Sequence, residues 1–183
     1  MGWIAVALLF RSAEVAGTDR GVDAFFADSG LVELTIEADF DALTHDKDRD
    51  PPVTKPGVMT VVGTDGAPRA LDVSLTTRGV SRLRLGICSF PQFFVHIKGD
   101  GSEDTVFSGQ GMLPLATHCK SPDHYDQYEL QEYLVYRTRS VLTDLSVRSR
   151  LARVTYVDTN REKKTRTRYA FFLEHFDHMA DRL

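Results

Sequence analysis

The clearest chemical cluster in the sequence is His118, Cys119 and His124, which places two imidazoles and a thiol close together. A zinc site needs a third or fourth ligand, and His175 and His178 lie too far along the chain for their spacing to support one. Cys119 is also badly placed as a nucleophile for His118, because adjacent residues on a strand point to opposite faces. A strand-end histidine beside a buried cysteine explains the pattern equally well.

A second candidate is the run Asp46-Lys47-Asp48-Arg49-Asp50, whose alternate acids resemble a calcium loop. The glycine that turns an EF-hand loop and its closing glutamate are both missing, so a solvated loop is the simpler interpretation. The sequence also lacks a nucleophile elbow, a Walker loop and a dinucleotide glycine fingerprint. We therefore expect no catalytic residue and no metal site.

Arginines form the third candidate, since residues 148–168 hold eight bases and two acids. Arg148 and Arg150 share one face of a predicted strand, as do Arg166 and Arg168, and paired strands would gather four guanidiniums on a surface that can hold phosphates. Aromatic side chains do not alternate with them as a nucleic-acid platform requires, so no nucleic-acid partner is expected. Two oppositely charged, solvated faces of one fold are the simpler reading, because residues 19–50 hold ten acids and three bases.

Cys88 and Cys119 are the only cysteines, and the sequence leaves open whether they form a disulfide or stay as buried thiols. The apolar run Gly2–Phe10 is too short to span a bilayer. It fits either the remnant of a signal sequence over residues 1–17 or an apolar N-terminal strand or helix. No transmembrane span is expected.

Apolar and polar alternation predicts the elements that would position these groups. Strands are expected over 31–37, 58–62, 70–77 and 90–97, with a polar loop at 46–56, so residues 31–98 form a β-rich part. A strand over 112–117, a helix from the N-cap Ser121 to Leu142, strands over 150–157 and 166–173, and a terminal helical turn follow within residues 105–183. We predict one α+β domain over residues 1–183.

Several blocks of the second half resemble bacterial proteins of the CotH-like family, atypical kinases related to spore-coat CotH. They include Phe107-Ser108-Gly109-Gln110, Ala116-Thr117-His118-Cys119, Gln131-Glu132-Tyr133-Leu134-Val135-Tyr136-Arg137, Arg150-Leu151-Ala152-Arg153-Val154-Thr155-Tyr156-Val157-Asp158 and Tyr169-Ala170-Phe171-Phe172-Leu173-Glu174. The resemblance implies an exported or envelope-associated protein whose α+β fold corresponds to the upper lobe of a kinase-like fold.

The resemblance also supplies the candidate ligand-binding residues, which are Arg78, Glu132 and Arg153. Simpler interpretations exist for two of them: Arg78 can stabilise a turn, and Glu132 can pair with a neighbouring arginine. Pro114 stands where similar sequences carry a lysine, and proline offers neither charge nor donor. The acidic and amide residues that hold metal in that family would lie beyond Leu183.

The expected function is therefore a catalytically incomplete, exported CotH-like module that binds or supports a partner, with no cofactor. The alternative is a phosphotransferase that uses ATP with Mg²⁺ or Mn²⁺ and is completed by a missing C-terminal lobe. A protein partner or that lobe would cover an apolar patch, for which Phe171, Phe172, Phe176 and Met179 are the candidates.

Overall fold

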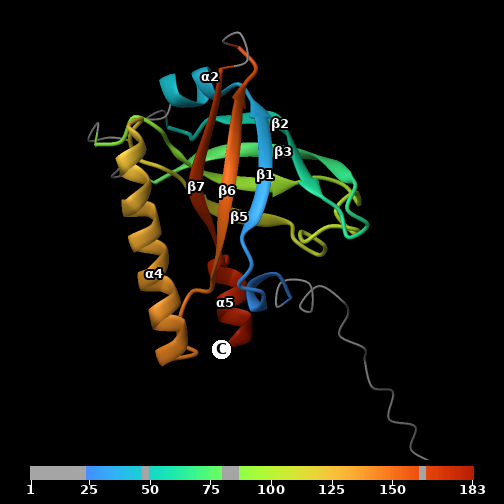
Figure 1. Ribbon diagram of the computed structural model, residues 1–183, viewed down its shortest axis with the longest axis vertical. Coiled ribbons are helices and arrows are strands. Elements are labelled where there is room, and N and C mark those ends of the chain that lie inside the picture. Colours follow the sequence, from blue (N-terminus) through green and yellow to red (C-terminus); the bar gives the residue numbers. More distant parts are fainter. Residues whose placement is uncertain (1–23, 47–49, 80–86, 161–163) are drawn as a thin grey trace, which may run out of the picture.

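A computed structural model describes residues 24–46, 50–79, 87–160 and 164–183 of the chain (Figure 1). The predicted signal remnant and much of the calcium-like loop lie outside these residues. The strands are β1 (Val32–Ala38), β2 (Thr54–Val62), β3 (Pro68–Arg78), β4 (Gln92–Ile97), β5 (Met112–Ala116), β6 (Ser149–Asp158) and β7 (Thr165–Leu173). The helices are α2 (Phe40–His45), the short 3₁₀ turn η1 (Asp123–Tyr125), α4 (Asp126–Leu142) and α5 (Phe176–Arg182).

The strands close into a barrel in the order β1-β2-β3-β4-β5-β7-β6. Neighbouring strands are antiparallel except at the closure, where β1 pairs with β6 in parallel from Val32 opposite Ala152 to Ala38 opposite Asp158. Figure 1 shows β1, β6 and β7 side by side along the long axis, with β2 to β5 crossing behind them. Strands of both halves of the sequence thus share one sheet.

Alternation along each strand fills the barrel, because successive side chains point to opposite faces. Leu34 and Ile36 of β1 point inward, and every other strand contributes aliphatic or aromatic side chains in the same way. Phe25, which precedes β1, lies 5.3 Å from Phe107 and 5.7 Å from Phe172 between ring centroids. Arg150 holds that N-terminal segment by donating to the carbonyl of Phe25 and pairing with Asp28.

Helix α4 lies outside the barrel against β6 and β7, on its left in Figure 1. Tyr133 is the main buried apolar side chain of the helix, and it packs with Phe171, Leu173 and Ala116. The outward-pointing residues at the end of β7 are therefore covered by α4. This overturns Phe171 and Phe172 as parts of an exposed patch, since both are fully buried.

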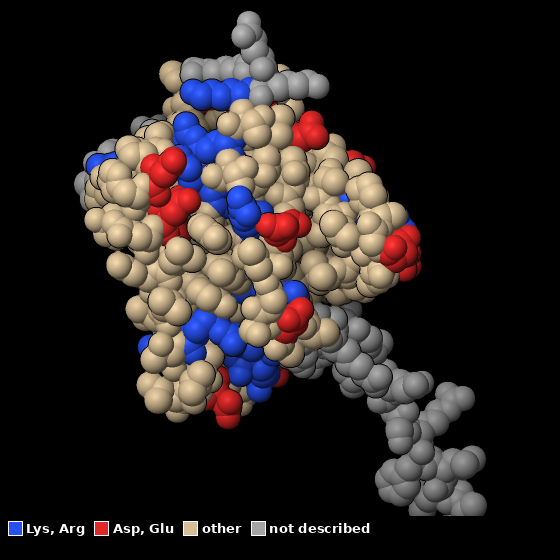
Figure 2. Space-filling model, in the orientation of Figure 1, with Lys and Arg blue, Asp and Glu red and all other residues tan. Residues whose placement is uncertain are grey.

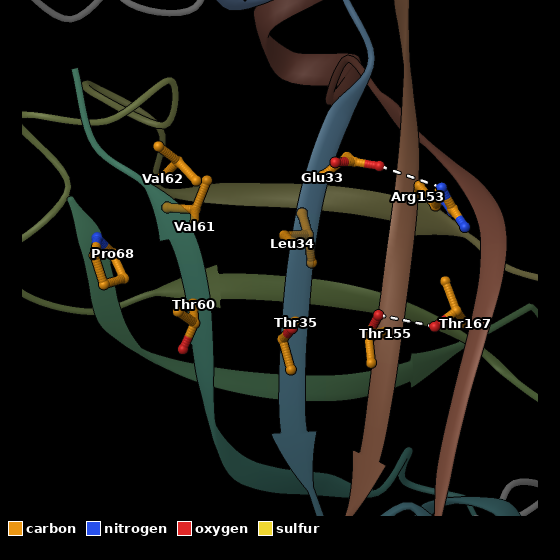
Figure 3. A pocket seen from close by; sticks show the side chains of 10 residues that line it. All are labelled: Glu33, Leu34, Thr35, Thr60, Val61, Val62, Pro68, Arg153, Thr155 and Thr167. Atoms are coloured by element: carbon orange, nitrogen blue, oxygen red, sulfur yellow. Dashed lines mark hydrogen bonds and ion pairs between the residues drawn. The ribbon is translucent and has the colours of Figure 1, made fainter. Parts of the chain in front are cut away.

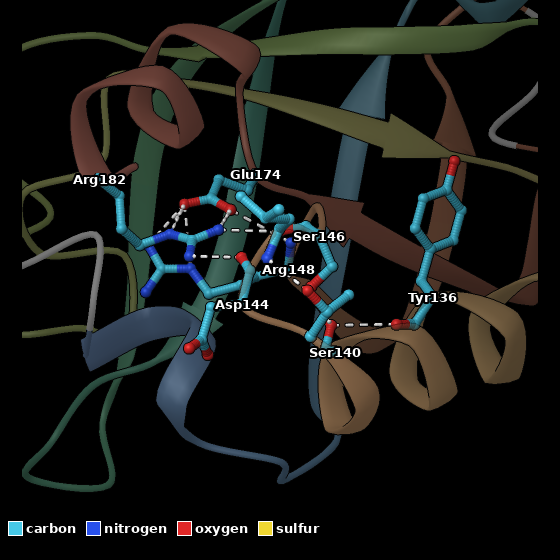
Figure 4. A network of polar contacts seen from close by, with 9 residues as sticks. Tyr136, Ser140, Asp144, Ser146, Arg148, Glu174 and Arg182 are labelled. Carbon is cyan, nitrogen blue, oxygen red and sulfur yellow. Dashed lines mark hydrogen bonds and ion pairs between the residues drawn. The ribbon is translucent and has the colours of Figure 1, made fainter.

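A buried carboxylate joins the lower elements (Figure 4). Glu174, at the end of β7, accepts from the Arg148 guanidinium at 2.6 Å and from Arg182 of α5 at 3.1 Å. Arg182 also donates to the carbonyls of Asp144 and Ser146, which lie between α4 and β6. These bonds lower the pKa of Glu174 against the opposing effect of burial, so the group is a carboxylate at neutral pH.

The α+β kinase-like lobe expected from the sequence is wrong, because the chain forms a closed seven-stranded barrel. The prediction treated 31–98 and 105–183 as successive parts. Two pairings between them, β1 with β6 and β4 with β5, join these parts into one sheet. Residues that far apart in sequence carry no local pattern that reveals such pairings, so alternation alone did not indicate closure.

Two element boundaries also differ from prediction. The loop predicted to extend to Pro56 ends earlier, because β2 begins at Thr54 and pairs with β3 from there. The predicted N-cap Ser121 does not start the long helix, which begins at Asp126 after the 3₁₀ turn. Arg168 accounts for the shift, since it donates to the Ser121 carbonyl at 2.5 Å. None of the described helices is both long and apolar enough to cross a membrane.

Candidate functional site

The barrel opens between β5 and β7 at the end nearest α2. These two strands pair only through Leu115 with Phe172 and Ala116 with Phe171. Beyond Ala116 the chain turns away from β7, and the Thr117 hydroxyl donates to the Pro91 carbonyl at 2.7 Å. Among the described strands, the first half of β7 pairs only with β6. The space between this half of β7 and the chain after β5 is therefore lined by side chains and not bridged by backbone hydrogen bonds.

A disulfide between Cys88 and Cys119 fixes one wall of this opening. The Cys119 carbonyl accepts from the backbone N–H of Ser89 at 2.8 Å and of Phe90 at 3.3 Å. This bridge joins two segments 31 residues apart and stacks the Phe90 ring on His118, with 4.4 Å between ring centroids. The cysteine pair that the sequence left open therefore has a structural role beside the opening.

The opening contains a cavity of about 280 Å³. Its walls are aromatic, and Tyr156 lies 5.1 Å from Phe90 and 5.3 Å from Phe40 between ring centroids. The full lining comes from α2, β6, β7 and the segments beside the disulfide: Phe40, Asp41, Thr44, Ser89, Phe90, His118, Ser121, Tyr156, Asp158, Lys164 and Arg166. We call this cavity the mouth pocket.

His118 is a neutral imidazole with one unused donor. A guanidinium only donates, so the contact of 3.5 Å between Arg166 Nη1 and His118 Nε2 favours the tautomer that carries the ring proton on Nδ1. Burial, followed by the charges of Arg166 and Arg168, lowers the pKa of His118 from 6.5 to about 3. The side chain is fully buried, and Nδ1 has no hydrogen-bond partner among the described residues.

Tyr156 supplies a second unused donor. Its hydroxyl is buried and has no hydrogen-bond partner in the described part of the chain. Burial, reinforced by Glu129 and Asp126, raises the pKa of Tyr156 far above 10, so the hydroxyl keeps its proton. An unsatisfied buried hydroxyl costs about 1–3 kcal/mol, so a ligand that supplied an acceptor to Tyr156 would offset this cost.

Arg166 and Arg168 hold the segment that follows His118. Arg166 donates to the Ser121 hydroxyl at 3.1 Å, and Arg168 pairs with Asp123 at 2.6 Å. Arg168 also approaches Asp126 at 3.6 Å, although burial still raises the pKa of Asp126. Figure 2 shows basic side chains over the upper parts of β6 and β7 next to acidic side chains at the upper end of α4.

A larger but shallower groove of about 340 Å³ runs over the outer face of β1, β2 and β6 (Figure 3). Its polar side chains pair with one another: Arg153 lies 3.4 Å from Glu33, and the hydroxyls of Thr155 and Thr167 lie 2.9 Å apart. We favour the mouth pocket as the functional site, because it combines aromatic walls with buried donors that lack acceptors.

The ligand candidates from the sequence lie on three different elements, and none lines the mouth pocket. Arg153 is in the outer groove. The Arg78 guanidinium, at the end of β3, lies 5.1 Å from the centroid of the Phe94 ring. Glu132 is half-buried on α4. Pro114, where a lysine was expected from the resemblance, is buried in β5.

The arginine surface predicted from the sequence is not formed. Strands β6 and β7 do pair, but Arg150 lies opposite Phe172 whereas Arg166 lies opposite Tyr156, at the other end of the hairpin. Cys119 is in a disulfide and therefore offers no thiolate to a metal or a substrate. The described residues contain no group of three or more side chains arranged to hold a metal ion.

Sequence reasoning considered His118 as a metal ligand or base and set both roles aside, and it gave Tyr156 no role in a site. A signal for Tyr156 was present, since its alternation with Val154 and Ala152 places it on the inner face of β6. Comparisons with protein-family models, with curated proteins and with solved structures found no match. The geometry of the site therefore carries the functional argument.

Proposed function

We propose that the protein is a non-catalytic binding module whose mouth pocket takes a small planar molecule bearing one carboxylate or phosphate group. The observation that carries this proposal is that two residues lining the cavity, His118 and Tyr156, each hold a buried polar atom, Nδ1 and the hydroxyl, without a hydrogen-bond partner among the described residues. A ligand oxygen is the acceptor that these groups lack.

The remaining lining defines the ligand more closely. Phe40, Phe90 and the Tyr156 ring offer apolar faces to a planar group. Arg166 and Lys164 provide positive charge for an anionic group, while Asp41 and Asp158 disfavour a second one. A volume of about 280 Å³ lies at the lower end of small-molecule sites, which favours a ligand of one ring over a larger one.

The chemistry of the pocket favours binding over catalysis. A histidine with a pKa of about 3, whose Nε2 accepts from Arg166, is a weak base at neutral pH. Tyr156 holds its proton too firmly to act as an acid there. These groups are suited to donating hydrogen bonds to a ligand.

The location and family of the protein remain part of the proposal. The disulfide is compatible with export, because such bridges persist in oxidising compartments. Kinship with the CotH-like family rests on the sequence blocks alone. The phosphotransferase alternative is not carried further, since it depended on the kinase-like upper lobe that the barrel replaces.

Thermal unfolding with defined probes tests the proposal, because a ligand that binds only the folded state raises the midpoint. Benzoate is expected to raise the midpoint of the wild-type protein. Inorganic phosphate should raise it less, because it lacks a ring. Arg166→Met and Lys164→Met should each reduce the benzoate shift, and Arg153→Met in the outer groove should leave it unchanged.

Two results would contradict this assignment. One is no shift with benzoate in a cooperative melt, and the other is a shift that survives both pocket variants. Lys164 is exposed, so its variant tests the pocket even if Arg166→Met disturbs the segment after His118. If the midpoint rose only with ATP and Mg²⁺, the ligand would be assigned as a nucleotide and not as a single-ring molecule.

A further inference from the structure

The outer side of α4 carries an apolar stripe that nothing in the described barrel covers. Tyr128, Val135 and Leu142 recur every seven residues, and Leu134 and Val141 lie next to the last two. These side chains, together with Leu145 just beyond the helix, are 52–83% exposed. In Figure 2 the surface over the middle of α4 is largely uncharged, with basic side chains beside its lower part.

The position of these residues around the helix makes the stripe continuous. At 100° per residue, the exposed apolar residues of the helix spread over about 140° on the side opposite Tyr133, which faces the barrel. Gln131 and Thr138 lie between them and are uncharged. A seven-residue apolar repeat beside uncharged polar positions is the pattern of a helix that packs against another helix.

We propose that this stripe is the interface of an antiparallel homodimer, in which α4 of one copy packs against α4 of a second copy. A two-fold axis at Val135 places Tyr128 opposite Leu142 of the other copy and Val135 opposite its own counterpart. The stripe is therefore self-complementary under two-fold symmetry, as an isologous interface requires.

The charged residues beside the stripe, Glu132 and Arg139, independently support a two-fold axis close to Val135. Glu132 and Arg139 lie on the same edge of the stripe, about 20° apart around the helix. In a two-fold antiparallel pair this edge faces itself, and an axis at Val135 brings Arg139 of one copy within one residue, about 1.5 Å along the helix, of the level of Glu132 of the other. In a parallel two-fold pair this edge would face the opposite edge of the stripe, so Glu132 and Arg139 of the two copies would not meet. Opposed helix dipoles also favour the antiparallel arrangement.

The length of the helix sets the expected affinity. Seventeen residues extend for about 25 Å, so one helix pair lies near the lower limit of specific interfaces, about 1,000–1,200 Å² in total. A dissociation constant in the micromolar range is therefore expected. The mouth pocket lies at the α2 end of the barrel and is not part of this interface.

Sedimentation velocity over protein concentrations from about 1 to 100 μM tests for the dimer in that range. The wild-type protein should shift from monomer to dimer, and Val135→Glu with Leu142→Glu should stay monomeric with an unchanged circular dichroism spectrum. Val62→Glu alters an apolar residue of similar exposure on β2 and should dimerise normally. A wild-type monomer throughout, or a dimer unaffected by the α4 changes, overturns the proposal.

Cysteine cross-linking tests the orientation. Oxidation should cross-link Val135→Cys to itself, and should cross-link a mixture of Tyr128→Cys and Leu142→Cys more efficiently than either variant alone. Efficient self-cross-linking of both single variants would show a parallel pair and contradict the antiparallel axis. Binding of a monomeric wild type to anionic phospholipid vesicles, lost in the α4 variant, would assign the stripe to a membrane surface instead.

Discussion

At the scale of single residues, the mouth pocket is marked by His118 and Tyr156, which are among the buried polar side chains that have no hydrogen-bond partner in the described residues. Tyr156 and His118 lie among Phe40 and Phe90, where a protein without a ligand would be more stable with apolar side chains. Retaining the polar groups lowers stability unless an acceptor arrives. The proposed ligand would offset this cost.

Tyr156→Phe is therefore expected to raise the stability of the ligand-free protein. The change removes a buried hydroxyl that lacks a partner and leaves the ring contacts in place, so the free energy of unfolding should rise by about 1 kcal/mol. Urea denaturation measures this difference. Tyr128→Phe, which alters an exposed hydroxyl, should change stability little. A clear loss of stability in Tyr156→Phe would mean that its hydroxyl has a structural partner.

His118 should make stability depend on pH below neutrality. Its folded pKa of about 3 lies below the unfolded value of 6.5, so the unfolded state binds the extra proton between these values. The contribution is fully present above pH 6.5 and is lost as pH falls towards 3, with a slope of about 1.4 kcal/mol per pH unit.

Comparison of the wild type with His118→Gln between pH 6.5 and 5 isolates this effect, because the contributions of Glu174 and of Asp126, whose pKa burial raises, are shared by both proteins. In His118→Gln, the slope of the free energy of unfolding against pH should fall in that window by the amount that corresponds to one proton. Equal slopes in the wild type and the variant would show that His118 takes up a proton in the folded state, contrary to its burial between Phe90 and Arg166.

At the scale of elements, Glu174 is the connection between β7, α5 and the segment before β6. Glu174→Gln removes the charge that Arg148 and Arg182 share and should lower the free energy of unfolding by about 2–4 kcal/mol, since breaking a buried pair leaves uncompensated groups. Glu33→Gln breaks the exposed pair with Arg153 and should cost less than about 1 kcal/mol. Equal effects in urea denaturation would contradict the buried network.

The disulfide between Cys88 and Cys119 holds together the two segments that form one wall of the mouth pocket. Replacing Cys88 and Cys119 together by serine removes a cross-link that closes a loop of 31 residues and should cost about 3–4 kcal/mol. It should also weaken the benzoate shift, because Phe90 and His118 are presented by the bridged segments. Calorimetric melts of the two proteins measure both effects. An unchanged shift in the variant would show that hydrogen bonds alone hold that wall.

Local elements were predictable from the sequence because their signals are local. The alternation around Leu34 and Ile36 predicts β1 within a residue at each end, and the hairpin of β6 and β7 was also predicted closely. The start of α4 was not, since Arg168 draws the Ser121 carbonyl away from a helical start. That interaction spans 47 residues, so no local capping pattern encodes it.

At the scale of the whole molecule, closure of the barrel produces the candidate site. His118 follows β5, Tyr156 is near the end of β6 and Arg166 is near the start of β7, so only the order β5-β7-β6 brings them together. The sequence indicated the strands but not the ring they form, and for that reason His118 and Arg166 were considered separately and Tyr156 was not a candidate. The arrangement also leaves the outer side of α4 free for a second copy.

The most direct test of the account is calorimetric titration of benzoate into the wild-type protein and into Tyr156→Phe. We predict saturable one-site binding to the wild type and an affinity reduced at least about tenfold in the variant, since one hydrogen bond to the ligand oxygen is lost. Equal affinity in the two proteins, or no binding to a folded wild type, would contradict the claim that the buried donors of the mouth pocket await a ligand acceptor.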